Sequence, residues 1–271
     1  MSIEKYFDKN WENINFSQDK QKHLEVILYF INKYSKKETF SYFEFGCGNC
    51  YITNFLYQEL KDNYQDINFH VSDISRVGLS QCNDDFFKTV VSKKKMSFTE
   101  LYNQMDVVSS FEVFEHLDKE LESHYLNELI HISKQYLLIG VPYKEKLEKR
   151  VITCNSCGYI GHVYGHLRSY SMDRFSNLFK DKAKLIEYKL CGSEEIDFNI
   201  RQYNLSKKMG YKILNFTCPN CVEEQNDITY FNRIKNKIIG SLVLNKKMQK
   251  IEKHPFWIVG IFEKVNVDDK K

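Results

Sequence analysis

The sequence predicts an α/β domain built on a mostly parallel β-sheet with helices on both faces. Three observations support this fold class. Short apolar segments alternate with helical segments over the first half of the chain, a glycine-containing turn follows the first strand, and the hydrophobic fraction of 42% is that of a packed protein. With 271 residues, three prolines and no Gly/Ser-rich linker, the chain has room for one such domain with an insertion.

Strand and helix segments follow one another regularly up to residue 142. The aromatic and apolar run over residues 40–45 stops at Gly46, as a buried strand ending in a glycine turn does. A helix over 51–62 follows, and then a second strand over 67–73, where apolar and polar residues alternate. The order continues with a helix over 76–83, a weak strand over 86–91, a strong strand over 106–111, a helix over 119–134 and a strand over 136–141 that Pro142 stops.

Beyond residue 142 the pattern is less regular. Ser171 is a good N-cap for a helix over 172–179, and strands are predicted over 185–190 and 256–262. The segments 143–170 and 195–250 read as irregular or partly helical. We therefore expect a helical N-terminal segment over 1–37, a main domain over 38–264 with insertions at about 143–170 and 195–250, and a flexible tail over 265–271.

The charge pattern argues against several classes of protein. The chain has 39 basic and 36 acidic residues, and its basic residues form no extended stripe of the kind that tracks nucleic-acid phosphates. The N-terminus carries charges where a signal peptide needs an apolar core, and no apolar run approaches the roughly 20 residues that span a bilayer. We expect a cytoplasmic protein without a membrane span.

The turn after the first strand is the most informative segment for function. Glycines at 46 and 48, between a strand and a helix, let the backbone approach a ligand closely. Asp73 ends the second strand, where a carboxylate can accept hydrogen bonds from the hydroxyl groups of a ribose. A dinucleotide-binding dehydrogenase would need a further glycine where this chain has Ile52.

This turn resembles the first motif of the class I S-adenosylmethionine-dependent methyltransferases. The motif has the form acid–x–Gly–x–Gly–x–Gly, and Glu44, Gly46 and Gly48 match it, with Cys50 in place of the third glycine. The resemblance implies a Rossmann-like fold with a seven-stranded sheet, and S-adenosylmethionine as cofactor. The cofactor-binding residues that it implies are Glu44, Gly46, Gly48, Asp73, Ile74 and Phe111.

Two Cys-x-x-Cys pairs have the spacing of zinc knuckles. Each pair can place two thiolates on one metal ion, and four thiolates form a closed structural zinc site. A third pair, at 47 and 50, lies in the glycine turn, where a metal would collide with the cofactor. We expect the cysteines to reflect metal binding or chance rather than disulfides. The predicted zinc ligands are Cys154, Cys157, Cys218 and Cys221.

The acceptor side of the site is less well defined by the sequence. His166 lies in a segment, 165–171, that resembles one found after the fifth strand of many small-molecule methyltransferases, and we predict His166 and His116 as catalytic residues. Glu112, Glu115 and His116 have a second interpretation, because some quinone-type O-methyltransferases bind a divalent metal near such residues. A third interpretation is that the acidic residues only stabilise a helix start.

The predicted function is methyl transfer from S-adenosylmethionine to a small or carrier-linked acceptor, on oxygen or nitrogen of a sugar or natural-product intermediate. One alternative is an RNA or protein methyltransferase that uses its zinc knuckles for docking. Another is a non-catalytic scaffold that kept the cofactor-binding fold.

Overall fold

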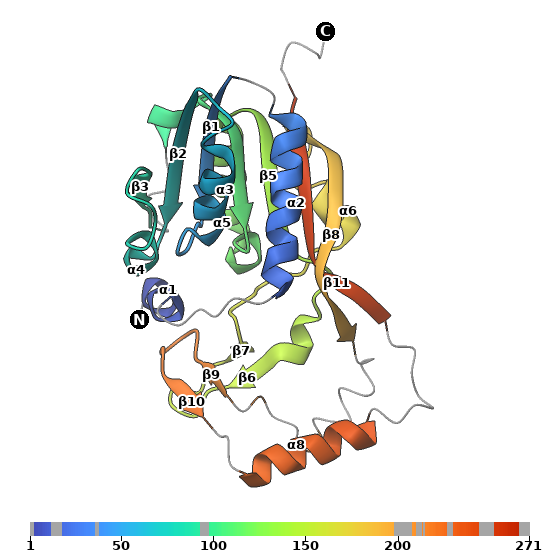
Figure 1. The fold of residues 1–271 in the computed structure, drawn as a ribbon. Helices are drawn as coiled ribbons and strands as arrows, with labels where there is room; N and C mark the ends of the chain where they lie inside the picture. Colours follow the sequence, from blue (N-terminus) through green and yellow to red (C-terminus); the bar gives the residue numbers. More distant parts are fainter. Residues whose placement is uncertain are drawn as a thin grey trace.

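A computed structural model describes residues 3–11, 18–35, 38–92, 98–197, 208–209, 213, 215–226, 230–243 and 252–265. Seven strands form the central sheet in the order β3-β2-β1-β4-β5-β11-β8 (Figure 1). Their bounds are β1 Thr39–Phe45, β2 Asp66–Asp73, β3 Phe87–Val90, β4 Met105–Phe111, β5 Ser133–Pro142, β8 Ala183–Asp197 and β11 Glu252–Lys264. The pairs among β3, β2, β1, β4 and β5 are parallel, whereas β11 runs antiparallel to both β5 and β8.

Helices cover both faces of this sheet, as predicted. The helices are α1 Ile3–Trp11, α2 Gln18–Tyr34, α3 Tyr51–Leu60, α4 Arg76–Leu79, α5 Lys119–Ile132, α6 Met172–Ser176 and α8 Tyr230–Val243. Successive strand residues point to opposite faces. Tyr42 of β1 therefore packs in one core with Phe30 of α2, while its neighbour Phe43 packs in a second core with Leu129 of α5. The two cores together bury most residues of β1, β4 and β5, whereas β3 at the sheet edge is exposed.

The order of the strands reverses next to β1. Strand β1 has β2 on one side and β4 on the other, so the connections leaving β1 and β4 run in opposite directions. In open α/β sheets, ligands bind at such a switch point, outside the carboxyl ends of the strands. The turn after β1 and the segment after β4 both lie there.

The insertions contain two short hairpins, which sequence reasoning read as irregular. Strands β6 (Val151–Thr153) and β7 (Ile160–His162) form one, and β9 (Asn215–Thr217) and β10 (Glu224–Asn226) form the other. Figure 1 shows both hairpins beyond the carboxyl ends of the central strands, with α8 further out. None of the described helices combines the length and apolar character that a membrane span needs.

Several predicted bounds are corrected. Helix α6 ends at Ser176 rather than 179, and α5 ends at Ile132, because Ser133 already pairs with Met105 in the sheet. Strand β8 runs to Asp197, beyond the predicted 190 and into the second predicted insertion, because it follows β11 along its whole length. Ser171 is the predicted N-cap, with its Oγ accepting the Arg174 N–H. Of the predicted tail over 265–271, residues 266–271 lie outside the described residues.

Candidate active site

The turn between β1 and α3 has the backbone that its glycines permit. Gly46 and Gly48 have φ angles of +72° and +56°. A Cβ on Gly46 would lie 2.2 Å from Val113 Cγ2, so a side chain does not fit there. Cys50, in the place of the third glycine, also has a left-handed φ, 57°. A non-glycine residue in this conformation costs about 1–2 kcal/mol, so the departure from the glycine motif carries an energetic cost.

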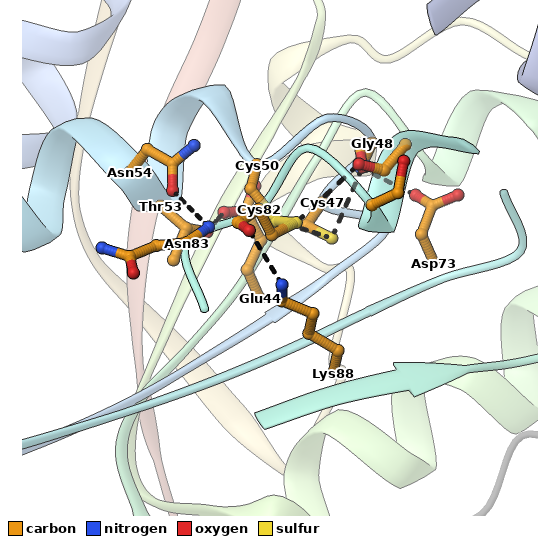
Figure 2. The surroundings of a disulfide bond; sticks show 12 residues. Glu44, Cys47, Gly48, Cys50, Thr53, Asn54, Asp73, Cys82, Asn83 and Lys88 are labelled. Atoms are coloured by element: carbon orange, nitrogen blue, oxygen red, sulfur yellow. Dashed lines mark hydrogen bonds between the residues drawn. A yellow bond between two sulfur atoms is a disulfide. The ribbon is translucent and has the colours of Figure 1, made fainter. Parts of the chain in front are cut away.

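Cys50 is held in this position by a disulfide to Cys82 (Figure 2). The two Cα atoms are 5.0 Å apart, and Cys47 Sγ lies 3.5 Å from Cys50 Sγ. The expectation that the cysteines form no disulfide is therefore wrong for this pair. The start of α3 and the segment after α4 pack together, as the hydrogen bond from Asn83 N–H to Asn54 Oδ1 shows, and this packing brings the two cysteines into contact.

Asp73 ties the glycine turn to the end of β2. Its Oδ2 accepts the Gly48 N–H at 2.8 Å, and its Oδ1 accepts the Ser75 N–H at 2.7 Å. Burial raises the pKa of this carboxyl, and the backbone hydrogen bonds oppose that rise. Asp73 also lines the cavity described below, where a carboxylate can accept a hydrogen bond from a hydroxyl group of a ligand.

Glu44 lies behind the turn rather than on the cavity wall. Its Oε2 accepts a hydrogen bond from the Thr53 hydroxyl at the start of α3. Burial raises the pKa of Glu44 to about 8, so the carboxyl is largely protonated at neutral pH. Neither Glu44 nor Gly48 lines the cavity, whereas Gly46, Asp73, Ile74 and Phe111 do.

A cavity of about 660 Å³ opens at the switch point of the sheet. The turn, the end of β2 and the segment after β4 form one wall. The arms of the two hairpins form the opposite wall, and α1 contributes aromatic side chains. The residues that line the cavity are Tyr6, Phe7, Phe45, Gly46, Asp73, Ile74, Phe111, Glu112, Val113, His116, Leu117, Leu121, Arg150, Val163, Tyr164, His166, Ile213, Asn215, Phe216 and Thr217.

Helix α1 bridges the two walls of this cavity. Its Asp8 Oδ1 accepts a hydrogen bond from the Ser75 hydroxyl at 2.6 Å, next to the glycine turn and the end of β2. On the other side, Lys9 Nζ lies 3.0 Å from Glu224 Oε1 in the second hairpin. Sequence reasoning missed α1 as part of the site, because nothing in residues 3–11 shows that the helix folds back over the sheet.

The predicted catalytic histidines lie together on the polar part of the wall. The ring centroids of His116 and His166 are 4.7 Å apart. His166 Nδ1 lies 2.5 Å from Glu145 Oε2, and His162 Nε2 lies 3.3 Å from Glu145 Oε1. Arg150 Nε is 3.4 Å from the same Oε1. Sequence reasoning did not single out Glu145, which no spacing relates to position 166.

Burial and close contacts set the protonation states of His116, His166 and Glu145. Burial and the nearby His166 lower the pKa of His116 to about 3. Burial also lowers the pKa of His166, against the raising effect of its hydrogen bond to Glu145. Burial alone would raise the pKa of Glu145, but its close contacts with the imidazoles of His162 and His166 outweigh burial and bring the pKa to about 2. The wall therefore carries neutral imidazoles beside an ionised carboxylate.

The acidic segment after β4 only partly fits its predicted metal interpretation. Ligand atoms of Glu115, His116 and His166 lie within 4.8 Å of one another, whereas Glu112 is outside this group. The loop that carries His166 is anchored separately, because Arg168 donates a hydrogen bond to the Leu117 carbonyl.

The four predicted zinc ligands converge at the tips of the two hairpins. Cys154 and Cys221 have their sulfurs 3.7 Å apart, Cys157 and Cys218 have theirs 3.8 Å apart, and all four lie within 4.8 Å of one another. Thiolates held at about 2.3 Å around a tetrahedral zinc are about 3.8 Å apart, so the spacing fits this ion.

The two hairpin tips have the same hydrogen bonds. Cys154 N–H donates to the Tyr159 carbonyl and Cys218 N–H to the Glu223 carbonyl, each five residues ahead. Gly158 and Val222 occupy the same left-handed position in each turn, with φ of 71° and 64°. Each pair is thus a knuckle, and the cavity wall includes Val163 and Tyr164, just after β7, and Phe216 on β9.

Comparison with solved structures identifies the fold. The chain superposes with a TM-score of 0.55 on a Bacillus halodurans C-125 protein described as a methyltransferase (10% identity, 89% of this chain and 100% of that one). It matches a chain from the complex of the Haloferax volcanii Trm112 methyltransferase activator with a methyltransferase (TM-score 0.53, 13% identity, 98% of both chains).

A third match is the magnesium protoporphyrin IX methyltransferase of Synechocystis PCC 6803 with bound SAH (TM-score 0.51, 11% identity, 70% of this chain and 92% of that one). No family model matches the sequence, and no curated protein does. The chain therefore has the predicted Rossmann-like fold of the class I methyltransferases, and this assignment rests on structure rather than on sequence identity.

The raised pKa of Glu44 predicts a pH-dependent stability. Because the folded pKa, about 8, exceeds the unfolded value of 4.5, the folded state holds this proton more tightly. Glu44 therefore contributes stability that is fully present below about pH 4.5 and is lost as the pH rises to about 8. Glu44→Gln keeps an acceptor for Thr53 and removes the ionisation. The free energy of unfolding of both proteins is measured in urea at pH 5 and at pH 8.5. The stability gained by the variant over the wild type should be larger at pH 8.5 than at pH 5, by on the order of a few kcal/mol. A difference that is constant between the two pH values would refute the assignment.

Proposed function

We propose that this chain is an S-adenosylmethionine-dependent methyltransferase that acts on a small or carrier-linked acceptor. The observation that carries the proposal is the two-sided cavity. The glycine turn and Asp73 lie on one side, and His116 and His166 lie together where the segment after β4 meets the opposite wall. A volume of about 660 Å³ is within the range of ligand pockets, and such a cavity has room for a cofactor and part of an acceptor.

The cofactor is proposed to lie along the first wall. The free lone pairs of Asp73 accept the ribose hydroxyls, Ile74 packs on the adenine, and Gly46 allows the backbone to approach the methionine part. Phe111, at the end of β4, lies under the sulfonium end. Glu44 then supports the site indirectly, because its hydrogen bond from Thr53 holds the start of α3, and it does not line the cavity.

Methyl transfer requires the protein mainly to align the acceptor with the methyl group of the cofactor. A lone pair on the acceptor attacks the methyl carbon in line, the carbon–sulfur bond breaks, and its electron pair stays on sulfur to leave S-adenosylhomocysteine. Holding the two reactants in this geometry supplies most of the rate enhancement. The acceptor also loses a proton, for which His166 and His116 are the proposed catalytic residues.

We further propose that Cys154, Cys157, Cys218 and Cys221 hold a structural zinc ion. The sulfur spacing supports this assignment, and a four-thiolate site leaves no open position for a substrate. Because both knuckles continue into the acceptor wall, the ion would fix the shape of that wall rather than take part in the reaction.

The first test is a transfer assay. Purified protein is incubated with methyl-labelled S-adenosylmethionine and with small-molecule, RNA and protein fractions of a host extract. We expect label in the small-molecule fraction. Label in RNA or protein would favour the alternative in which the knuckles, which expose Ile160, dock a macromolecule. Cofactor binding without any transfer would favour a scaffold.

A cytoplasmic location stays a prediction. The Cys50–Cys82 disulfide does not favour it, because disulfides are rare in the cytosol.

Removing the Asp73 carboxylate is expected to weaken cofactor binding. Asp73→Ala deletes the partner proposed for the ribose and should cost about 1–3 kcal/mol of binding free energy. Isothermal titration with S-adenosylhomocysteine measures this change. Because Asp73 also holds the turn, the thermal midpoint of each variant is recorded as well. An unchanged dissociation constant would show that Asp73 does not contact the ribose.

Replacing His166 tests its role in turnover separately from cofactor binding. His166→Ala should lower kcat by about 10²-fold, the scale of general-base catalysis, and leave the affinity for S-adenosylhomocysteine unchanged. His254→Ala, at a buried histidine on β11, is the matched control. Wild-type turnover in His166→Ala would return this residue to a structural role.

Loss of the knuckles should affect metal content and turnover together. Wild-type protein is expected to carry zinc at the four cysteines, and Cys154→Ser with Cys157→Ser should release it and collapse the acceptor wall. Elemental analysis and the transfer assay measure the two effects. Cys191→Ser, at a buried cysteine outside the cluster, is the control. A zinc-free wild type that is folded and active would contradict the zinc proposal.

A further inference from the structure

We infer that Glu145 and His166 form a carboxylate–imidazole pair that takes the proton from a hydroxyl group of the acceptor, so that the reaction is an O-methylation. This inference rests on the proposed function and adds the acceptor class to it. Glu145 is a positioning residue, since His166 lines the cavity and Glu145 does not.

The hydrogen bond between the two side chains fixes the tautomer of His166. The distance from His166 Nδ1 to Glu145 Oε2 is 2.5 Å, and the side chains are 6% and 2% exposed. Because the carboxylate can only accept, Nδ1 carries the proton and Nε2 keeps its lone pair. A base whose second nitrogen is held by a carboxylate is the arrangement in which a histidine is both oriented and stabilised when it gains a charge.

Glu145 is itself held in place from the side away from His166. His162 Nδ1 is 3.3 Å from the backbone N–H groups of Tyr164 and His166 and accepts from both. This leaves the proton of His162 on Nε2, which lies 3.3 Å from Glu145 Oε1. Arg150 Nε approaches the same oxygen at 3.4 Å. Oε1 thus faces these groups, and Oε2 faces His166.

Other charged and titratable groups surround the pair. His116 packs edge-on against the His166 ring at 4.7 Å, and Glu115 has a ligand atom within 4.8 Å of both histidines. An imidazolium on His116 would repel one on His166, so only one of the two rings can take a proton readily. His166 is favoured, because it is the one bonded to the Glu145 carboxylate.

The need for a base points to a hydroxyl acceptor. A neutral amine attacks with its own lone pair and can release its proton afterwards, and a thiol ionises with little help. A hydroxyl group is a poor nucleophile until its proton is removed. In the proposed step the hydroxyl proton moves to His166 Nε2 while the oxygen forms the new bond to the methyl carbon. The carbon–sulfur pair stays on sulfur, and the imidazolium, held by Glu145, later releases its proton to solvent.

The pair is tested first without any acceptor. Nitrogen-15 NMR of histidine-labelled wild-type protein, assigned with His166→Ala, should show His166 protonated on Nδ1. Glu145→Gln should populate the other tautomer, while Glu148→Gln, at a nearby exposed glutamate, should change nothing. An Nε2-protonated His166 in the wild type would overturn the pairing, even if the glutamine variant failed to fold.

The acceptor class is tested with S-adenosylmethionine labelled with carbon-13 on the methyl group and the small-molecule extract. The carbon-13 shift of the product should be that of a methoxy carbon, and an N-methyl or S-methyl carbon would overturn the inference. Glu145→Gln should lower kcat by about 10²-fold at unchanged KM, and the acidic limb of its pH–rate profile should move to lower pH. Glu145→Asp should recover part of the rate. Absence of transfer would count against the proposed function, while the NMR result would still decide the pairing.

Discussion

The hydrogen bond from Gly48 N–H to the Asp73 carboxylate is the contact on which the candidate site depends. It joins the turn after β1 to the end of β2, at the point where the order of the strands reverses. The bond is buried and charge-assisted, which makes it stronger than a neutral hydrogen bond. Asp73 therefore has two tasks, since the carboxylate that shapes the turn also faces the cavity in which we place the cofactor.

The second wall of the cavity is organised by a different kind of contact. Among the described residues, two short hairpins carry it rather than strands of the central sheet. The four cysteine sulfurs at their tips lie within 4.8 Å of one another, and α1 joins this wall to the first through Asp8 and Lys9. The wall along which we place the cofactor is thus built into the sheet, whereas the wall at which we place the acceptor is attached to it. This separation suits a fold in which one cofactor serves many acceptors.

The features that sequence reasoning predicted are those with a local signature. The strand–turn–helix at Gly46 and Gly48, the acid at the end of β2 and the two Cys-x-x-Cys knuckles each occupy a few adjacent residues. The glycine turn and Asp73 lie in the predicted elements, and the four knuckle cysteines lie together as predicted, although their hairpins were not predicted. The alternation of strands and helices predicted the sheet and its two covered faces for the same reason.

The features that it missed depend on segments far apart in the chain. Glu145 meets His166 only because the first hairpin folds back on itself, and Cys82 meets Cys50 only because α3 packs against the segment after α4. The length of β8 follows from its partner β11, not from its own pattern of residues. No spacing in the sequence encodes these contacts, because tertiary packing creates them.

The most direct measurement is a crystal structure of the protein with S-adenosylhomocysteine. We expect the ribose hydroxyls to contact Asp73, the adenine to pack on Ile74, and the sulfur to face the part of the cavity bounded by His116 and His166. A cofactor bound elsewhere, or bound with its sulfur turned away from these histidines, would contradict this expectation.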